Sequence, residues 1–170
     1  MKKNKLESDL EHSRAAYRFA VNGLPLPDSL KSGTIRANGF EFARESQIES
    51  MKIEYGWAFF CRYEACVERF IRNKGVHLSK RLSLLDWLDK NNIKFPGNYR
   101  IGMDAYRKIR NSLHHSDGAS LSGEPDTEIH LYPEQMENFF KLFVWIGSAV
   151  ENLNHGSRDV GFVPSSTSMT

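Results

Sequence analysis

A cluster of reactive side chains lies in residues 105–118, which read A-Y-R-K-I-R-N-S-L-H-H-S-D-G. A permanent cation, an amide and two imidazoles are supplied by Arg110, Asn111, His114 and His115. An imidazole with a pKa of about 6.5 can give or take a proton near neutral pH, and a guanidinium matches the oxygens of a phosphate. These residue types therefore indicate acid–base chemistry on a phosphodiester without a metal ion.

An amphipathic helix is expected to present this cluster. The apolar residues at helical spacing are Tyr106, Ile109 and Leu113. On an ideal helix of about 3.6 residues per turn, His114 lies almost above Arg110 and His115 almost above Asn111. The two columns should form a solvated edge beside the apolar face, and Ser116-Asp117-Gly118 predicts the end of the helix.

A second predicted helix carries a carboxylate within an apolar stripe. The stripe consists of Ile53, Trp57, Phe60, Glu64, Val67 and Ile71. Because an unpaired carboxylate is costly to bury, two interpretations of Glu64 are open. Either this edge of the stripe reaches solvent, or Glu64 pairs with Arg110 or with the histidine column and positions those residues.

Two segments resemble the HEPN superfamily of small all-helical domains, many of which are metal-independent ribonucleases. Residues 110–115 match the R-N-x-x-x-H form of that family's arginine–histidine motif. Residues 57–64, W-A-F-F-C-R-Y-E, are similar to the aromatic-rich early helix in which HEPN domains carry an acidic residue. The resemblance implies that Arg110 and His115 are the principal catalytic pair and Asn111 the polar position after the arginine, with His114 as a second imidazole.

The resemblance also implies a function and partners. It predicts an endoribonuclease of the toxin or defence type, which cleaves RNA to a 2′,3′-cyclic phosphate at a composite site. That site would lie between the two motif helices of a homodimer, with RNA across the shared cleft. An antitoxin or another regulatory protein is a candidate partner. The alternative is a catalytically silent helical module that dimerises or binds RNA or a nucleotide, in which Arg110 and His115 only cap the helix.

Charge is distributed unevenly along the chain. The net charge is +2, but residues 69–111 carry eleven Lys or Arg and three Asp, a net charge of +8. This segment could bind a phosphate backbone, or it could be an ordinary solvated surface. The candidate RNA-binding residues are Arg72, Arg100, Arg107 and Lys108.

Length and composition predict one soluble domain. The 170 residues are 40% hydrophobic and 12% aromatic, which is typical of a folded globular protein. The chain contains neither a long apolar run nor a signal-like opening, so we expect a cytoplasmic protein. Cys61 and Cys66 should point to different faces of one helix, and the six histidines are dispersed, so we expect neither a metal site nor a cofactor.

The expected fold is all-α: an up-and-down, HEPN-like bundle of about four to six helices in a single domain, residues 1–154. Before the core bundle of residues 40–154, a helix over 5–21 should precede a long connection over 22–39, with at most a short helix around residues 29–31. Within the bundle, the periodicity predicts a long helix over 40–73, a shorter one over 78–88, the motif helix, and a last helix starting at Pro133. We expect a flexible loop over 119–126, a brief extended segment over 127–131 and a disordered tail over 155–170.

Overall fold

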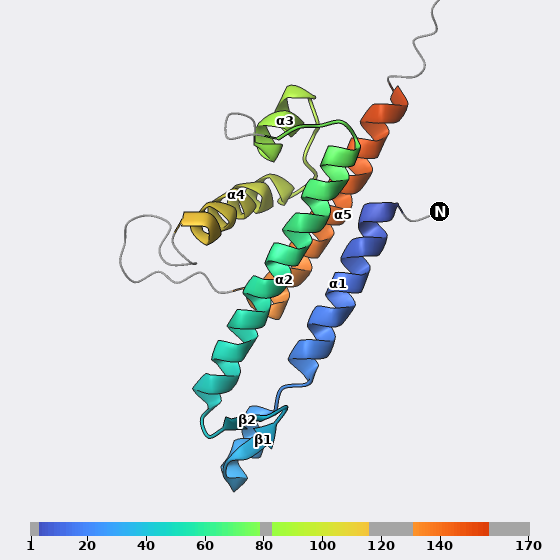
Figure 1. Ribbon diagram of the computed structural model, residues 1–170. Coiled ribbons are helices and arrows are strands. Elements are labelled where there is room, and N and C mark those ends of the chain that lie inside the picture. The colour runs from blue at the N-terminus through green and yellow to red at the C-terminus, as the bar shows by residue number, and fades with distance from the viewer. Residues whose placement is uncertain (1–3, 79–82, 116–130, 157–170) are drawn as a thin grey trace, which may run out of the picture.

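The chain forms a bundle of helices with a small β-hairpin beyond the end of its first helix (Figure 1). A computed structural model describes residues 4–78, 83–115 and 131–156, apart from the side chains of residues 113–115 and 154–156. Its elements are α1 (Lys5–Asn22), the 3₁₀ helix η1 (Pro27–Ser32), β1 (Ile35–Ala37), β2 (Phe40–Phe42), α2 (Glu45–Asn73), α3 (Leu84–Lys90), α4 (Tyr99–His115) and α5 (Pro133–Gly156). The predicted all-α class is confirmed, and the five α-helices of the described residues lie within the predicted range.

Helices α1 and α2 form an antiparallel pair. Arg69, late in α2, donates a hydrogen bond of 3.0 Å to Asp9, early in α1. Tyr17, late in α1, contacts Phe59 near the middle of α2, with 5.5 Å between the ring centroids. The bounds of α1, Lys5–Asn22, confirm the first helix predicted from the sequence.

Helix α5 runs parallel to α2. Phe60 packs against Phe139 in the first half of α5, with 5.1 Å between the ring centroids. Lys74, just beyond α2, meets Glu151 in the second half of α5 at 3.6 Å. The predicted up-and-down order is wrong for α4, which lies across the long helices instead of running alongside them (Figure 1).

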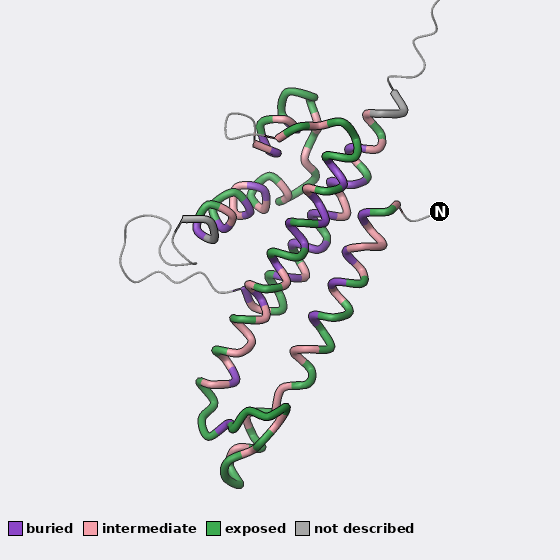
Figure 2. The backbone as a smooth tube through the Cα atoms, in the orientation of Figure 1, coloured by how far each residue is buried: buried purple, intermediate pink, exposed green. Residues whose placement is uncertain are grey.

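The core is rich in aromatic side chains from α2, α4 and α5. Figure 2 shows the buried positions of these helices turned toward one another. Tyr63 and Phe143 are fully buried, with 6.3 Å between their ring centroids. Of the predicted stripe on α2, Phe60, Glu64, Val67 and Ile71 are buried, whereas Ile53 and Trp57 are only partly buried. The residues that α5 buries at helical spacing include Phe139, Phe143, Ile146 and Val150. Edge-to-face aromatic pairs of this kind contribute about 0.5–1.5 kcal/mol each beyond the area they bury.

The predicted connection over residues 22–39 contains a short helix where the sequence allowed one, and also a strand that was not predicted. It includes η1 and the first strand of a two-stranded antiparallel hairpin, in which Ala37 pairs with Phe40. The two residues between the strands, Asn38 and Gly39, have φ angles of 50° and 80°. Positive φ at both positions is the condition for the tight turn that joins paired strands, and Asn-Gly satisfies it readily. The dipeptide was therefore a hairpin signal as well as a turn signal.

Three predicted boundaries also need correction. The long helix begins at Glu45 instead of residue 40, because residues 40–42 belong to β2. The short helix α3 begins at Leu84, where the Ser83 hydroxyl accepts a hydrogen bond from the Asp86 amide and the Asp86 carboxylate accepts one from the Ser83 amide. Helix α5 continues to Gly156, so the predicted tail begins at least two residues later than residue 155.

Some predictions fall on residues that the structure does not describe. These are the end of the motif helix at residues 116–118, the loop over 119–126, most of the extended segment over 127–131, and the tail from residue 157. Of the helices that are described, none combines the length and the apolar character that a membrane crossing requires.

Gly56 allows α5 to begin close against α2. It is buried, and a Cβ atom built on it would collide with the backbone carbonyl oxygen of Leu131, two residues before α5. Backbone atoms cannot rotate away as a side chain can, so a larger residue would push the two segments apart. The parallel packing of α2 and α5 therefore depends on a missing side chain at this position.

We predict that Gly56→Ala lowers the free energy of unfolding by about 2 kcal/mol, because this collision outweighs the gain of about 1 kcal/mol from alanine's higher helix propensity. The matched control is Gly102→Ala in α4, where the new Cβ would meet only a Leu142 methyl group at 3.2 Å. That control should be neutral or slightly stabilising. Urea unfolding measures both, and equal effects of the two substitutions would contradict the proposed role of Gly56.

Candidate functional site

Helix α4 brings Arg110 to the boundary between the core and solvent. Met103, Tyr106 and Ile109 recur at a spacing of three and are buried against the bundle. The Arg110 side chain, the next residue along, is 43% exposed, and Asn111 is exposed. The helix therefore presents a guanidinium that touches the protein on one side and solvent on the other.

Two carboxylates of α2 hold this guanidinium. Arg110 Nε donates to Glu64 Oε1 at 2.5 Å, and Arg110 Nη2 donates to Glu68 Oε1 at 2.9 Å. The pairing of Glu64 with Arg110 was one of the two interpretations drawn from the sequence, and it is present. Charge-assisted hydrogen bonds from two nitrogens of a planar group restrict its orientation more than one contact would.

Glu64 is the buried member of this cluster. Its side chain is only 9% exposed, whereas that of Glu68 is 35% exposed. The buried Tyr106 hydroxyl lies within hydrogen-bonding reach of Glu64, so the carboxylate has a neutral donor as well as a cation. A buried carboxylate with several donors is stable where an unpaired one would not be. The alternative interpretation, that this edge of the stripe reaches solvent, applies to Glu68 and not to Glu64.

Burial and charge act in opposite directions on Arg110. Burial lowers the pKa of Arg110, but the hydrogen bond and the charge of Glu64, together with the hydrogen bond to Glu68, raise that pKa above its usual value overall. Arg110 therefore remains protonated under all conditions in which the protein is folded. Burial, reinforced by the charge of Glu64, raises the pKa of Tyr106 as well, so Tyr106 remains a neutral hydrogen-bond donor.

The formal charges of the cluster do not favour an anion by themselves. Arg110, Glu64 and Glu68 sum to −1, and an added phosphate would meet two carboxylates beside one guanidinium. Among the described residues, none makes a hydrogen bond with Arg110 Nη1. A phosphate bound there would therefore require further positive charge from a neighbouring segment or from a second copy.

The sequence analysis missed Glu68. A signal for it was present, because residues four apart lie one above the other on a helix, and Glu68 follows Glu64 by four. Glu68 is not a member of the apolar stripe of α2, so a search for charged residues within that stripe finds Glu64 alone.

The predicted imidazoles are only partly located. The backbone of His114 and His115 belongs to the last turn of α4, so both residues follow Arg110 on the same helix. Their side chains lie outside the described residues, as does that of Leu113. Glu64, Arg110 and Asn111 are therefore placed in full, and the catalytic pairing of Arg110 with His115 stays a prediction.

The four candidate RNA-binding residues do not form one uninterrupted cationic patch. Arg100 pairs with Asp89 and stacks on the Phe95 ring, 5.2 Å from its centroid. Arg107 meets Asp104 at 3.8 Å, while Lys108 and Arg72 are exposed. Arg100 and Arg110 are ten residues apart on α4, which corresponds to about 15 Å along the helix axis. Part of the positive charge counted in the sequence is thus neutralised locally.

Metal ligands are not gathered in the part of the chain that the structure describes: no group of three or more His, Cys, Asp or Glu side chains there could hold an ion.

The chain matches no protein-family model, no curated protein and no solved structure. A functional assignment therefore depends on the chemistry of the residues themselves and on the geometry of α4 and α2.

Glu64 and Glu68 should differ in their importance for stability. We predict that Glu64→Gln lowers the free energy of unfolding by about 2 kcal/mol, because it weakens a charge-assisted bond that is largely shielded from water. The matched change Glu68→Gln should cost less than about 1 kcal/mol, because its carboxylate is more exposed and better screened. Urea unfolding of both variants tests this, and equal losses would mean that burial does not distinguish the two contacts.

The free energy of unfolding should decrease in alkaline solution, and Tyr106 should account for part of this decrease. Burial raises the pKa of Tyr106 above the value of 10.0 for an exposed tyrosine, and burial raises the pKa of Tyr17 to about 12. Above pH 10 the unfolded chain releases these protons while the folded chain keeps them, so each tyrosine lowers stability by about 1.4 kcal/mol per pH unit until it ionises in the folded state.

We therefore predict that Tyr106→Phe makes the decline of stability above pH 10 shallower by about 1.4 kcal/mol per pH unit. Urea unfolding at a series of pH values between neutrality and the alkaline transition measures this slope in the variant and in the wild type. An unchanged slope would show that Tyr106 ionises as readily in the folded protein as in the unfolded chain.

Proposed function

We propose that the chain is a metal-independent endoribonuclease of the toxin or defence type, which acts in the cytoplasm as a homodimer. The observation that supports this proposal most is the position of Arg110. Glu64 and Glu68 orient its guanidinium at the edge of the core, and it remains 43% exposed. It lies on the helix that continues into Asn111, His114 and His115.

The proposed reaction needs only these residue types. An imidazole, that of His115 in the first instance, takes the proton of the RNA 2′-hydroxyl, and the 2′-oxygen attacks the adjacent phosphorus. Arg110 stabilises the charge on the phosphate oxygens, and the bond from phosphorus to the 5′-oxygen breaks. A protonated imidazole, from His114 or from the second copy, returns a proton to the departing oxygen. The products are a 2′,3′-cyclic phosphate and a 5′-hydroxyl.

A two-fold dimer through α4 would supply what one chain lacks. In one copy, the cluster of Arg110, Glu64 and Glu68 carries a formal charge of −1. A second α4 facing the first would add the exposed Lys108 and Asn111 and a second pair of imidazoles around the same phosphate. Arg72, Arg100 and Arg107 would contact the RNA backbone on either side, and an antitoxin or regulatory protein would restrain the activity.

A second candidate function is favoured by the same cluster. A guanidinium already bonded to two carboxylates is the arrangement expected of a purely structural residue, one that fastens α4 to α2. In this case the chain is a non-catalytic helical module that dimerises or binds RNA or a nucleotide. The two candidates differ in whether Arg110 ever contacts a phosphate.

Labelled RNA incubated with purified protein in excess EDTA distinguishes them. We predict cleavage by the wild type, and a loss of roughly 10²-fold or more with Arg110→Ala or His115→Ala, because each removes a group that acts in the transition state. The matched control is Arg36→Ala, which removes another carboxylate-paired arginine, 3.4 Å from Glu41 in the β-hairpin, and should leave cleavage unchanged.

Product analysis and folding controls complete the experiment. The released 3′ ends should resist phosphatase until acid opens the cyclic phosphate. Circular dichroism shows whether Arg110→Ala still folds, since it also removes a contact between α2 and α4. Intact RNA with the folded wild type would reject the ribonuclease and favour the module. Cleavage that survives both active-site substitutions would reject Arg110 and His115 as the catalytic pair.

A further inference from the structure

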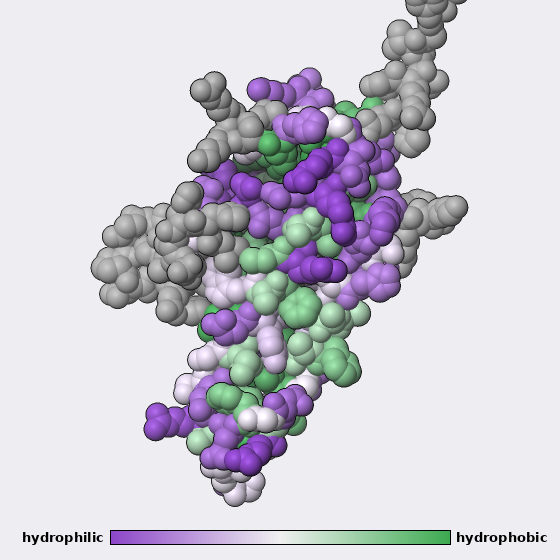
Figure 3. All heavy atoms as spheres, viewed as in Figure 1, coloured by the Kyte–Doolittle hydropathy of each residue, from purple (hydrophilic) through white to green (hydrophobic). Residues whose placement is uncertain are grey.

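The outer surface of the α1–α2 pair exposes apolar side chains to solvent. Phe19 on α1 is 85% exposed, although a phenylalanine is among the most apolar side chains. Both helices also expose small residues, namely Ala15 and Ala16 on α1 and Ala58 and Ala65 on α2. Figure 3 shows hydrophobic side chains gathered over this part of the pair. We call this surface the α1–α2 face.

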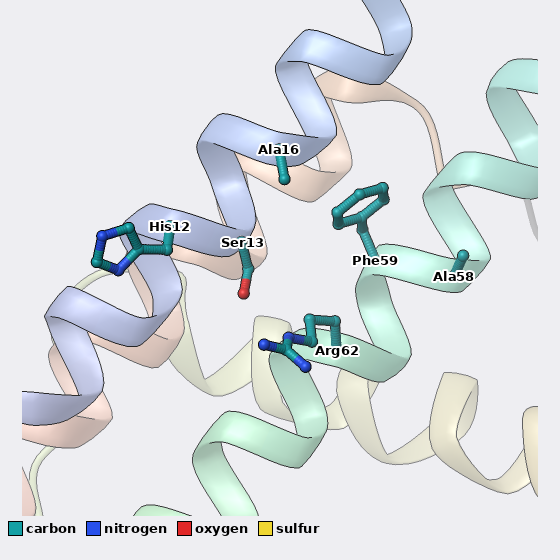
Figure 4. A pocket seen from close by; sticks show the side chains of 6 residues that line it. All are labelled: His12, Ser13, Ala16, Ala58, Phe59 and Arg62. Carbon is teal, nitrogen blue, oxygen red and sulfur yellow. The ribbon is translucent and has the colours of Figure 1, made fainter.

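A shallow groove runs along this face. It has a volume of about 430 Å³ and is lined by His12, Ser13, Ala16, Ala58, Phe59 and Arg62. In Figure 4, Phe59 and Arg62 extend from α2 into the space in front of α1, while Ala16 and Ala58 leave room on either side. The groove exists because small residues line both helices where their surfaces meet, so a helix from another molecule could approach closely.

Phe19 and Ala58 lie at the same height along the pair. The helices are antiparallel, Asp9 bonds to Arg69, and Tyr17 contacts Phe59. Each step toward the end of α1 corresponds to a step toward the start of α2. Counted from the Tyr17–Phe59 contact, Phe19 is level with Trp57. Counted from the Asp9–Arg69 contact, Phe19 is level with Phe59. Ala58 is therefore the residue of α2 opposite Phe19.

Charges are placed symmetrically about this height. Glu54 precedes Ala58 by four residues and Arg62 follows it by four, so they lie about 6 Å to either side along the helix axis. Both side chains are exposed. Among the described residues, neither takes part in an ion pair. Glu54 thus places an unpaired negative charge on one side of the centre, and Arg62 places an unpaired positive charge on the other.

We propose that a second copy of this chain docks on the α1–α2 face, about a two-fold axis that crosses both helices at Phe19 and Ala58. Such an axis turns α2 antiparallel to its copy and places α1 on its copy. It brings Phe19 against the partner's Phe19 and Ala58 against the partner's Ala58. An apolar ring contact and a close approach at small residues are suitable for the centre of an isologous interface.

The same axis brings opposite charges of the two copies to the same height at two places. Arg62 comes to the height of the partner's Glu54, and Glu54 comes to that of the partner's Arg62. A parallel arrangement would instead place like charges together, which costs affinity. The charge pattern therefore selects the two-fold antiparallel arrangement and a copy of the same chain as the occupant.

This interface is separate from the α4 dimer of the proposed function. Figure 1 shows α4 on the other side of α2 from α1. The two contacts can form together, in which case the chain assembles beyond a dimer, and either can fail without the other. A test must therefore report on the α1–α2 face alone.

Cross-linking at the axis provides such a report. In a Cys61→Ser background, which removes the exposed native thiol and keeps the buried Cys66, Ala58→Cys should give a covalent dimer with a short bismaleimide. The matched control is Ser148→Cys in the same background, an exposed position on α5 that should remain uncross-linked. Absence of a position-58 dimer at concentrations where the wild type self-associates would overturn the proposal, as would a chain that stays monomeric throughout.

Charge exchange tests the symmetry directly. Glu54→Arg or Arg62→Glu turns two attractive pairs into two repulsive ones, so either should weaken the dimer roughly tenfold or more. The double variant Glu54→Arg/Arg62→Glu restores opposite charges and should recover affinity close to that of the wild type. Dissociation constants from sedimentation and the yield of cross-link at position 58 measure this. A double variant as weak as the single ones would overturn the antiparallel two-fold arrangement.

Discussion

The bonds from Arg110 to Glu64 and Glu68 link the core of this protein to its candidate site. Glu64 occupies a position on α2 where an apolar residue would normally pack, and it is tolerated there because a guanidinium and a tyrosine hydroxyl surround it. The same bonds determine where α4 lies, since Arg110 can reach both carboxylates only if its helix crosses α2 near their height. A residue that would carry function is thus also one that holds two helices together.

The direction of α5 follows from the same crossing. With α4 lying across the bundle, the chain begins α5 beside the middle of α2 and runs parallel to it, from the contact of Gly56 with Leu131 to that of Lys74 with Glu151. Aromatic side chains fill the space between the three helices. Tyr106 belongs both to the aromatic core and to the cluster around Arg110, because its ring packs against Phe143 while its hydroxyl approaches Glu64.

Electrostatic pairing distinguishes the surfaces of the molecule. Much of the basic character of residues 69–111 is used within the fold, for example between Arg69 and Asp9 and between Arg100 and Asp89. Glu54 and Arg62 differ because their charges are exposed on a face that also carries Phe19. Net charge along a sequence is therefore a weaker guide to binding surfaces than the charges that remain unpaired after folding.

Features that depend on local spacing could be predicted from the order of the amino acids: the helices α1 and α5, the apolar stripe of α2, the carboxylate within it, and the position of Arg110, Asn111 and the two histidines near the end of one helix. Asn38-Gly39 is likewise a local signal, because this dipeptide favours the tight turn of a hairpin. Three other features become known from the packing of the helices: α4 crosses the bundle, α5 runs parallel to α2, and Glu68 joins Glu64 on the guanidinium of Arg110. Arg110 and Glu68 are 42 residues apart. Helical periodicity states which face of each helix is apolar, but it carries no information about which faces meet, because that choice depends on packing among all the helices together.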